Sequence, residues 1–170
     1  MGAMSRSDDL AAALEQTNAE LVAYLRGLDE RQWLTPGVNS PIFQMGDVDE
    51  HRPVGIIAHH VASAYTRSVM AVRMAVSGQA IPPPQAGSAA RHESEHAAPD
   101  QAGTIRLLEQ GAVEVAGIIR GLTDEELDRE AETFIGRTSV ATFIERAVNF
   151  HPRWHLTSIQ ATFEPAGQAT

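Results

Sequence analysis

The chain has 170 residues, enough for one domain that buries about two thirds of the surface its unfolded form exposes. It carries 13 Lys and Arg against 22 Asp and Glu, and the resulting net charge of -9 argues against electrostatic binding to nucleic acid. It has no cysteine, so a metal site must use histidine or carboxylate ligands, and thiol chemistry needs a thiol from outside.

The two ends of the chain frame one predicted domain at 8–165. Residues 1–7 lack a hydrophobic signal region and are interpreted as a disordered N-terminus or a cloning remnant, and 166–170 as a C-terminal tail. Within the domain, leucines recur at helical spacing over 8–28, and 29–33 can add a short turn.

A second helix is expected over 53–76, because Pro53 suits a first helical turn and apolar residues then recur on one face. Arg67 and Arg73 interrupt its longest apolar stretch, so we expect no membrane span and interpret the protein as cytoplasmic. The linker at 77–100 is rich in Pro, Ala and Gly and is expected to be extended or mobile. A lid and plain disorder are both open interpretations of it.

The C-terminal half predicts three further helices. The first covers 101–121, and a capping box at Thr123 begins a short one. After a turn, Thr138 or Ser139 caps a final helix that reaches about Phe163. No segment alternates with the period of a strand for long, so we predict an all-α fold, most simply a four-helix bundle.

Three histidines are candidate metal ligands. His151 and His155 lie four residues apart and continue the apolar stripe of the last helix, with Pro152 expected to bend the axis between them. On the second helix, His60 borders the buried face and His59 points to solvent. Buried imidazoles need their lone pairs satisfied, and a divalent ion would satisfy three at once. The alternative is that they only line a polar core.

Two further groups of residues are interpreted as solvated. His92 and His96 repeat the four-residue spacing, but the surrounding Ala, Ser, Gly and Pro favour a solvated helix start or loop over a metal site. Asp47, Asp49 and Glu50 could approach the histidines as hydrogen-bond partners or a base, but a solvated acidic turn is the favoured interpretation.

Two segments resemble the histidine motifs of the DinB/YfiT-like metalloproteins. They are Ile56-Ile-Ala-His-His-Val-Ala-Ser-Ala64 and Asn149-Phe-His-Pro-Arg-Trp-His-Leu-Thr-Ser-Ile159, and the similarity extends over about 8–163. The resemblance implies a four-helix bundle whose second and fourth helices hold one divalent ion, commonly zinc or nickel. Carried over by position, the ligands are His60, His151 and His155.

The resemblance also implies a range of activities, because some members of the family are thiol-dependent transferases or isomerases. We expect a small-molecule substrate and an S-transferase or isomerase in which the metal activates an external low-molecular-weight thiolate. A hydrolase that uses metal-bound hydroxide and a non-catalytic stress protein that binds metal or a small ligand are alternatives. A further alternative is a homodimer through apolar helix faces, although open coordination favours an enzyme.

Overall fold

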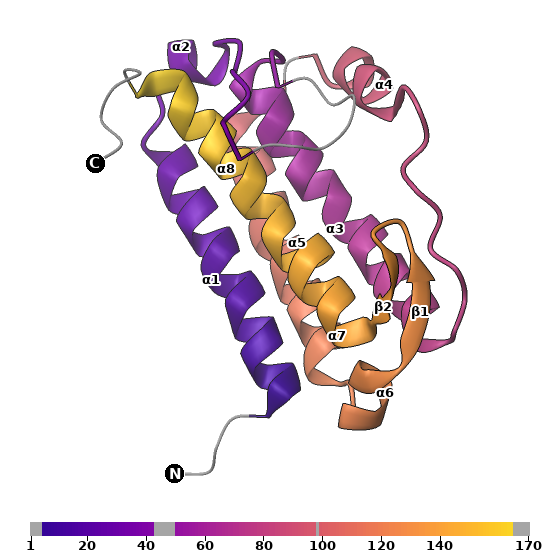
Figure 1. Cartoon of the computed structure of the whole chain (residues 1–170). Coiled ribbons are helices and arrows are strands. Elements are labelled where there is room, and N and C mark those ends of the chain that lie inside the picture. Colours follow the sequence, from indigo (N-terminus) through magenta and orange to yellow (C-terminus); the bar gives the residue numbers. More distant parts are fainter. Residues whose placement is uncertain (1–4, 43–49, 98, 165–170) are drawn as a thin grey trace.

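The computed structural model describes residues 5–42, 50–97 and 99–164 (Figure 1). Four long helical columns form its body: α1 (Arg6–Arg26), α3 (Val54–Val76), α5 (Gln101–Arg120), and a continuous last column made of α7 (Val140–Phe143), the π-helical segment η1 (Ile144–Asn149) and α8 (Phe150–Phe163). Shorter elements connect them: α2 (Glu30–Trp33), α4 (Ser88–Glu95), α6 (Asp124–Asp128), and the strands β1 (Glu130–Thr133) and β2 (Gly136–Ser139). The predicted all-α four-helix bundle is confirmed.

Local capping explains where several helices begin. Ser5 and Asp8 form a reciprocal capping box, so α1 starts at Arg6, within the segment that we expected to be disordered. Thr123 forms the predicted capping box of α6, and Ser139 caps the last helical column. The remaining residues of both chain ends lie outside the described ranges.

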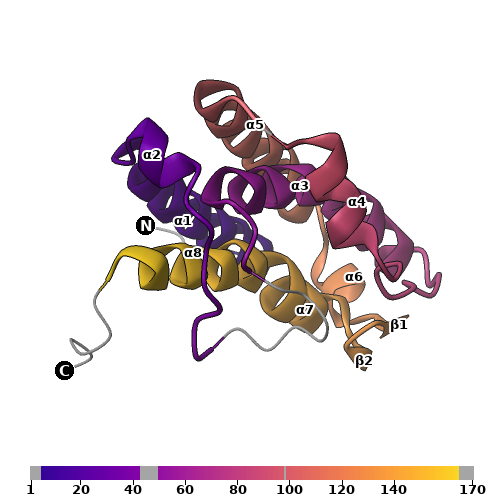
Figure 2. The same ribbon diagram turned by 90° about the horizontal axis from the view of Figure 1, so that it is seen from above.

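The helices pack in the cyclic order α1, α5, α3, α8 (Figure 2). At one end of the bundle, the side chain of Gln101 donates to the carbonyls of Leu25 and Leu28, and at the other end Arg120 pairs with Glu15. Helix α5 is therefore antiparallel to α1. Helix α3 begins beside the end of α2 and finishes beside β1, so it runs in the same direction as α5.

The parallel course of α3 and α5 explains the long linker between them. A helix of 23 residues is about 35 Å long, and the chain must return over this length before α5 begins. Ile81 is buried and its N–H donates to the carbonyl of Glu132, which anchors the start of this return. The extended linker is confirmed for its Pro-rich part, but the prediction missed α4, which lies beside α3.

A small antiparallel hairpin precedes the last helical column. Strand β1 pairs with β2 from Glu130 opposite Ser139 to Thr133 opposite Gly136, and Gly136 has a positive φ of 101°. The all-α prediction did not include this hairpin, because four-residue strands are too short to show a period of two. The turn that we predicted before the last helix lies at residues 134–135.

The core is formed by apolar side chains from all four columns, including Leu21, Val61, Leu108 and Ile159, which are fully buried. No helix in the described ranges is both long and apolar enough to cross a bilayer.

The last column is irregular just before the histidine pair. Pro152 is buried in the first turn of α8 and has no N–H for the carbonyl of Val148. The wide π-helical turns of η1 precede it and accommodate the missing bond. The irregularity therefore lies before His151, whereas we had expected a bend between His151 and His155.

Candidate metal centre

Three imidazoles from two helices converge inside the bundle. His60 comes from α3 and His151 and His155 from α8, and each offers a ring nitrogen within 4.8 Å of the other two. The ring centroid of His60 is 5.4 Å from that of His151 and 5.1 Å from that of His155. The structure thus brings together the three residues that the sequence singled out.

The hydrogen bonds of His155 fix the role of its two nitrogens. Its Nδ1 lies 2.8 Å from Oε2 of Glu50, and its Nε2 lies 3.2 Å from Nε2 of His151. A carboxylate only accepts, so Nδ1 of His155 carries the proton and donates it to Glu50. When the ring is neutral, this hydrogen bond leaves the lone pair of Nε2 directed at the other histidines, an arrangement common for metal-binding histidines.

Glu50 is held by a second buried partner. Its side chain is 0% exposed, and Oε1 accepts from Nη2 of Arg52 at 2.9 Å. Burial alone raises the pKa of Glu50, but the hydrogen bonds and charges of His155 and Arg52 outweigh it, so the pKa lies below the usual value. Glu50 is therefore an ionised carboxylate that orients His155.

Arg52 is itself an unusual residue in this position. Its side chain is 5% exposed, and its Nε and Nη1 atoms have no hydrogen-bond partner within the described residues. It bonds to Glu50, which in turn bonds to His155, and this chain of contacts places the guanidinium near the triad. A buried donor left unpaired is costly, so these N–H groups are candidates for binding a ligand.

Burial keeps the other two histidines of the triad neutral. It lowers the pKa of both His60 and His151 well below the usual value, and the charge of His155 adds to the effect. Neutral imidazole is the form that binds a metal ion.

The spacing of the nitrogens fits a metal ion. Two nitrogens that bind one tetrahedral zinc ion at about 2.05 Å each lie roughly 3.3 Å apart. The observed 3.2 Å between the Nε2 atoms of His151 and His155 is close to this spacing. In the part of the chain that the structure describes, no carboxylate joins the triad as a further member.

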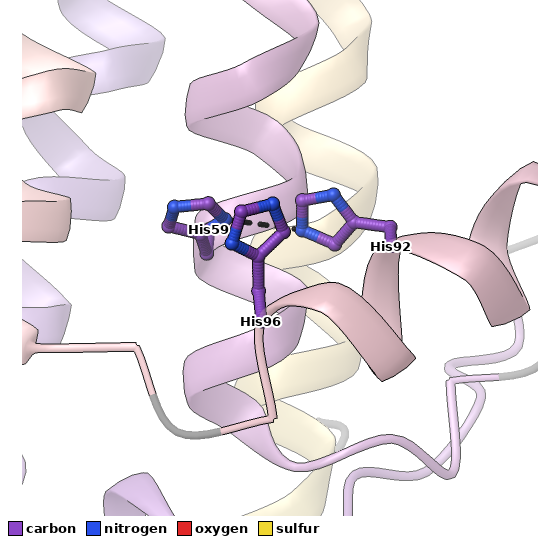
Figure 3. A group of neighbouring side chains, drawn as sticks. All are labelled: His59, His92 and His96. Atoms are coloured by element: carbon purple, nitrogen blue, oxygen red, sulfur yellow. Dashed lines mark hydrogen bonds between the residues drawn. The ribbon is translucent and has the colours of Figure 1, made fainter.

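A second group of histidines lies on the outer side of α3 (Figure 3). His59 faces His92 and His96, which come from α4 and its C-terminal end, and the ligand-capable nitrogens of all three lie within 4.8 Å of one another. We had predicted that His59 points to solvent and that His92 and His96 are solvated. All three side chains are half-buried, so they keep some contact with solvent, but the predictions missed that α4 lies against this side of α3 and brings the three rings together.

Burial lowers the pKa of histidines in this second group as well. Burial, followed by the charges of His59 and His96, lowers the pKa of His92 to about 4. Burial and the charge of His96 also lower the pKa of His59. These two rings are therefore neutral near pH 7.

The acidic segment before α3 is only partly described. Asp47 and Asp49 lie outside the described residues. Glu50 is fully buried and bonded to His155, so the favoured interpretation of a solvated acidic turn is wrong for this residue. Arg52 was not identified from the sequence, and no spacing signal distinguishes it from the other arginines.

The fold is similar to that of a solved structure described as "YfiT from Bacillus subtilis is a probable metal-dependent hydrolase with an unusual four-helix bundle topology". The two chains are 17% identical, the match covers 95% of this chain and 89% of that one, and the TM-score is 0.72. No protein-family model and no curated protein matches the chain. The resemblance inferred from the histidine motifs is thus confirmed at the level of the fold, and the chain has a YfiT-like four-helix bundle.

Proposed function

We propose that this protein is a metal-dependent enzyme that holds one divalent ion with His60, His151 and His155. The observation that carries the proposal is the convergence of three imidazoles from α3 and α8, at a spacing that suits a single ion. Three imidazoles suit zinc or nickel better than magnesium or calcium, which prefer oxygen ligands. Three protein ligands also leave coordination sites for an exogenous molecule, as in catalytic centres.

The residues around the triad have separate tasks in this proposal. Glu50 accepts the Nδ1 proton of His155 and so keeps the ring in the orientation and tautomer that bind metal. Arg52 neutralises Glu50 with one N–H group and presents Nε and Nη1 to a ligand. We therefore expect a small substrate with a carboxylate, phosphate or carbonyl oxygen that accepts from Arg52.

A divalent ion in such a site supplies Lewis acidity and lowers the pKa of a bound water or thiol. Hydrolysis is the first candidate reaction, and its support is the similarity of fold to a protein described as a probable metal-dependent hydrolase. Thiol transfer or isomerisation is the second, and its support is the resemblance of the two histidine motifs. Because the chain has no cysteine, the second reaction needs an added low-molecular-weight thiol.

Metal content and turnover test the proposal in turn. Protein purified without a polyhistidine tag and supplied with zinc or nickel should carry an ion that is lost when His60, His151 and His155 are all replaced by alanine. Full metal retention by the triple variant would overturn the assignment. Metal-dependent cleavage of model esters or amides without thiol identifies a hydrolase, whereas reaction with a model electrophile only after a thiol is added identifies a transferase. A folded, metal-loaded protein without either activity would instead support the non-catalytic alternative.

The predicted homodimer is tested separately. Light scattering combined with size-exclusion chromatography gives the mass of the particle in solution, and the mass of a single chain would exclude the dimer under those conditions.

A further inference from the structure

We propose that His59, His92 and His96 form a second site for a divalent transition-metal ion, separate from the triad of His60, His151 and His155. The site lies between α3 and α4 on the outer side of the bundle (Figure 3). The site uses different side chains from the first triad, so the proposal for it does not depend on the proposed function.

The arrangement of these three rings matches a set of metal ligands. Nδ1 of His59 lies 3.1 Å from Nε2 of His92, again close to the spacing of about 3.3 Å for two nitrogens on one tetrahedral ion. The ring of His96 completes the group, with its centroid 4.3 Å from that of His59 and 4.7 Å from that of His92. A hydrogen bond between the first two rings satisfies one lone pair, whereas an ion accepts a lone pair from each of the three.

The two triads share a plan. Each combines one histidine of α3 with a pair spaced four residues apart, which lies on α8 in the first triad and on α4 and its C-cap residue in the second. His59 and His60 are consecutive, so their side chains leave α3 about 100° apart. His60 therefore reaches toward α8, and His59 reaches toward α4.

Helix α4 has little else to hold it in place. None of its eight residues, all of which the structure describes, is fully buried, and a helix this short is marginal in water without tertiary contacts. The histidine cluster is a main point at which the described part of α4 meets α3. An ion bound there would join α4 to α3 and hold the crossover segment against the bundle.

The chemistry of the donors sets the class of ion. Three imidazoles favour zinc, nickel or copper(II) over magnesium and calcium. An open cavity of about 330 Å³ adjoins His59 and His96 and is also lined by Glu95, so an ion at this place has access to solvent and to a nearby carboxylate. The site thus has an entry path, and a water molecule can complete the coordination.

The two triads are also neighbours. The ring of His92 meets that of His60 edge-on at a centroid distance of 5.7 Å. Titration must therefore resolve two sites that are close together, and variants of each triad are needed to assign each equivalent of metal.

The test is the zinc stoichiometry of the full chain, purified without a polyhistidine tag, stripped with a chelator and titrated with Zn²⁺. The wild type should retain two equivalents after gel filtration, and His92→Ala and His151→Ala one each. Ser94→Ala, an exposed position on α4 outside the triad, is the matched control and should retain two. Two equivalents in His92→Ala would overturn the second site. A single equivalent in the wild type that is lost in His92→Ala but kept in His151→Ala would uphold it and overturn the first.

A second measurement needs no variant. Diethyl pyrocarbonate modifies accessible imidazoles, and mass spectrometry of the peptide that contains His92 and His96 reports their reactivity. In the wild type, saturating Zn²⁺ should protect this peptide from modification. The protection should appear as the second equivalent of zinc binds. Unchanged reactivity at saturating zinc would overturn the proposal even if the variants failed to fold.

Discussion

Replacing Glu50 by glutamine tests whether this buried carboxylate tunes the first triad. Glutamine keeps the size of the side chain but has one acceptor oxygen in place of two, so it can accept from His155 or from Arg52, and it removes the negative charge. Loss of such a hydrogen-bonding partner of a metal ligand costs about 10- to 100-fold in metal affinity. This factor corresponds to about 1.4 to 2.7 kcal/mol of binding free energy.

The same replacement also affects folding, because Glu50 is paired with buried Arg52. Removing one partner of a buried ion pair destabilises a protein by about 3 to 5 kcal/mol, and we expect a cost of this order, because the single amide oxygen replaces only one of the two carboxylate acceptors and the amide NH2 faces the other donor. Circular dichroism and chemical denaturation of the metal-free proteins measure this cost separately. The affinity comparison is then made under conditions where both proteins are folded.

Competition for zinc against a chromophoric chelator measures the affinity. Glu114→Gln is the matched control, since it removes the same charge from an exposed position on α5 and should leave affinity unchanged. If folded Glu50→Gln bound zinc within twofold of the wild type, Glu50 would not orient His155 for metal binding, and the role that we assign to it would be withdrawn.

Four further predictions concern stability and substrate binding. Gly117→Ala should raise the free energy of unfolding by up to about 1 kcal/mol, because alanine favours a helix and its Cβ meets nothing within 4 Å. Gly111→Ala should lower the free energy of unfolding by about 1 to 3 kcal/mol despite the same helix preference, because its Cβ would lie 2.6 Å from the ring of Tyr65. Urea denaturation of the two glycine variants compares these effects directly. Tyr65→Phe should cost about 1 to 3 kcal/mol in the same assay, since it leaves buried Oδ1 of Asn18 without its 2.7 Å partner. Arg52→Lys should retain metal but weaken binding of an anionic substrate or product about tenfold, as followed by calorimetry, and unchanged binding would show that Arg52 does not contact the ligand.

Helical periodicity predicted the main columns because each buries one continuous face. The predicted limits of α3 and α5 differ from the observed ones by about one residue, since Pro53 and Gly121 mark ends that depend on local backbone chemistry. Helix α4 has no buried apolar face, so the periodicity of apolar residues could not predict it. The hairpin was missed because its strands are shorter than the pattern that would reveal them.

The histidines show the same limit at the level of single side chains. Angular position on α3 correctly separated His60, which joins the histidines of α8, from His59, which does not. The residues that cover the outer side of α3 depend on the path of the crossover segment. The periodicity of α3 carries no information about this path. We expected solvent beside His59, but His92 and His96 lie there.

Glu50 illustrates why hydrogen-bond partners of a site are harder to predict than its ligands. The ligands lie on helices, where spacing fixes the direction of a side chain, whereas Glu50 lies outside the helices and its position depends on the long-range contact with His155. Its acidic neighbours in the sequence suggested solvation, but the cost of burying a carboxylate is offset here by Arg52 on one oxygen and His155 on the other. Glu50 thus connects buried Arg52 to the imidazole that faces the other two histidines.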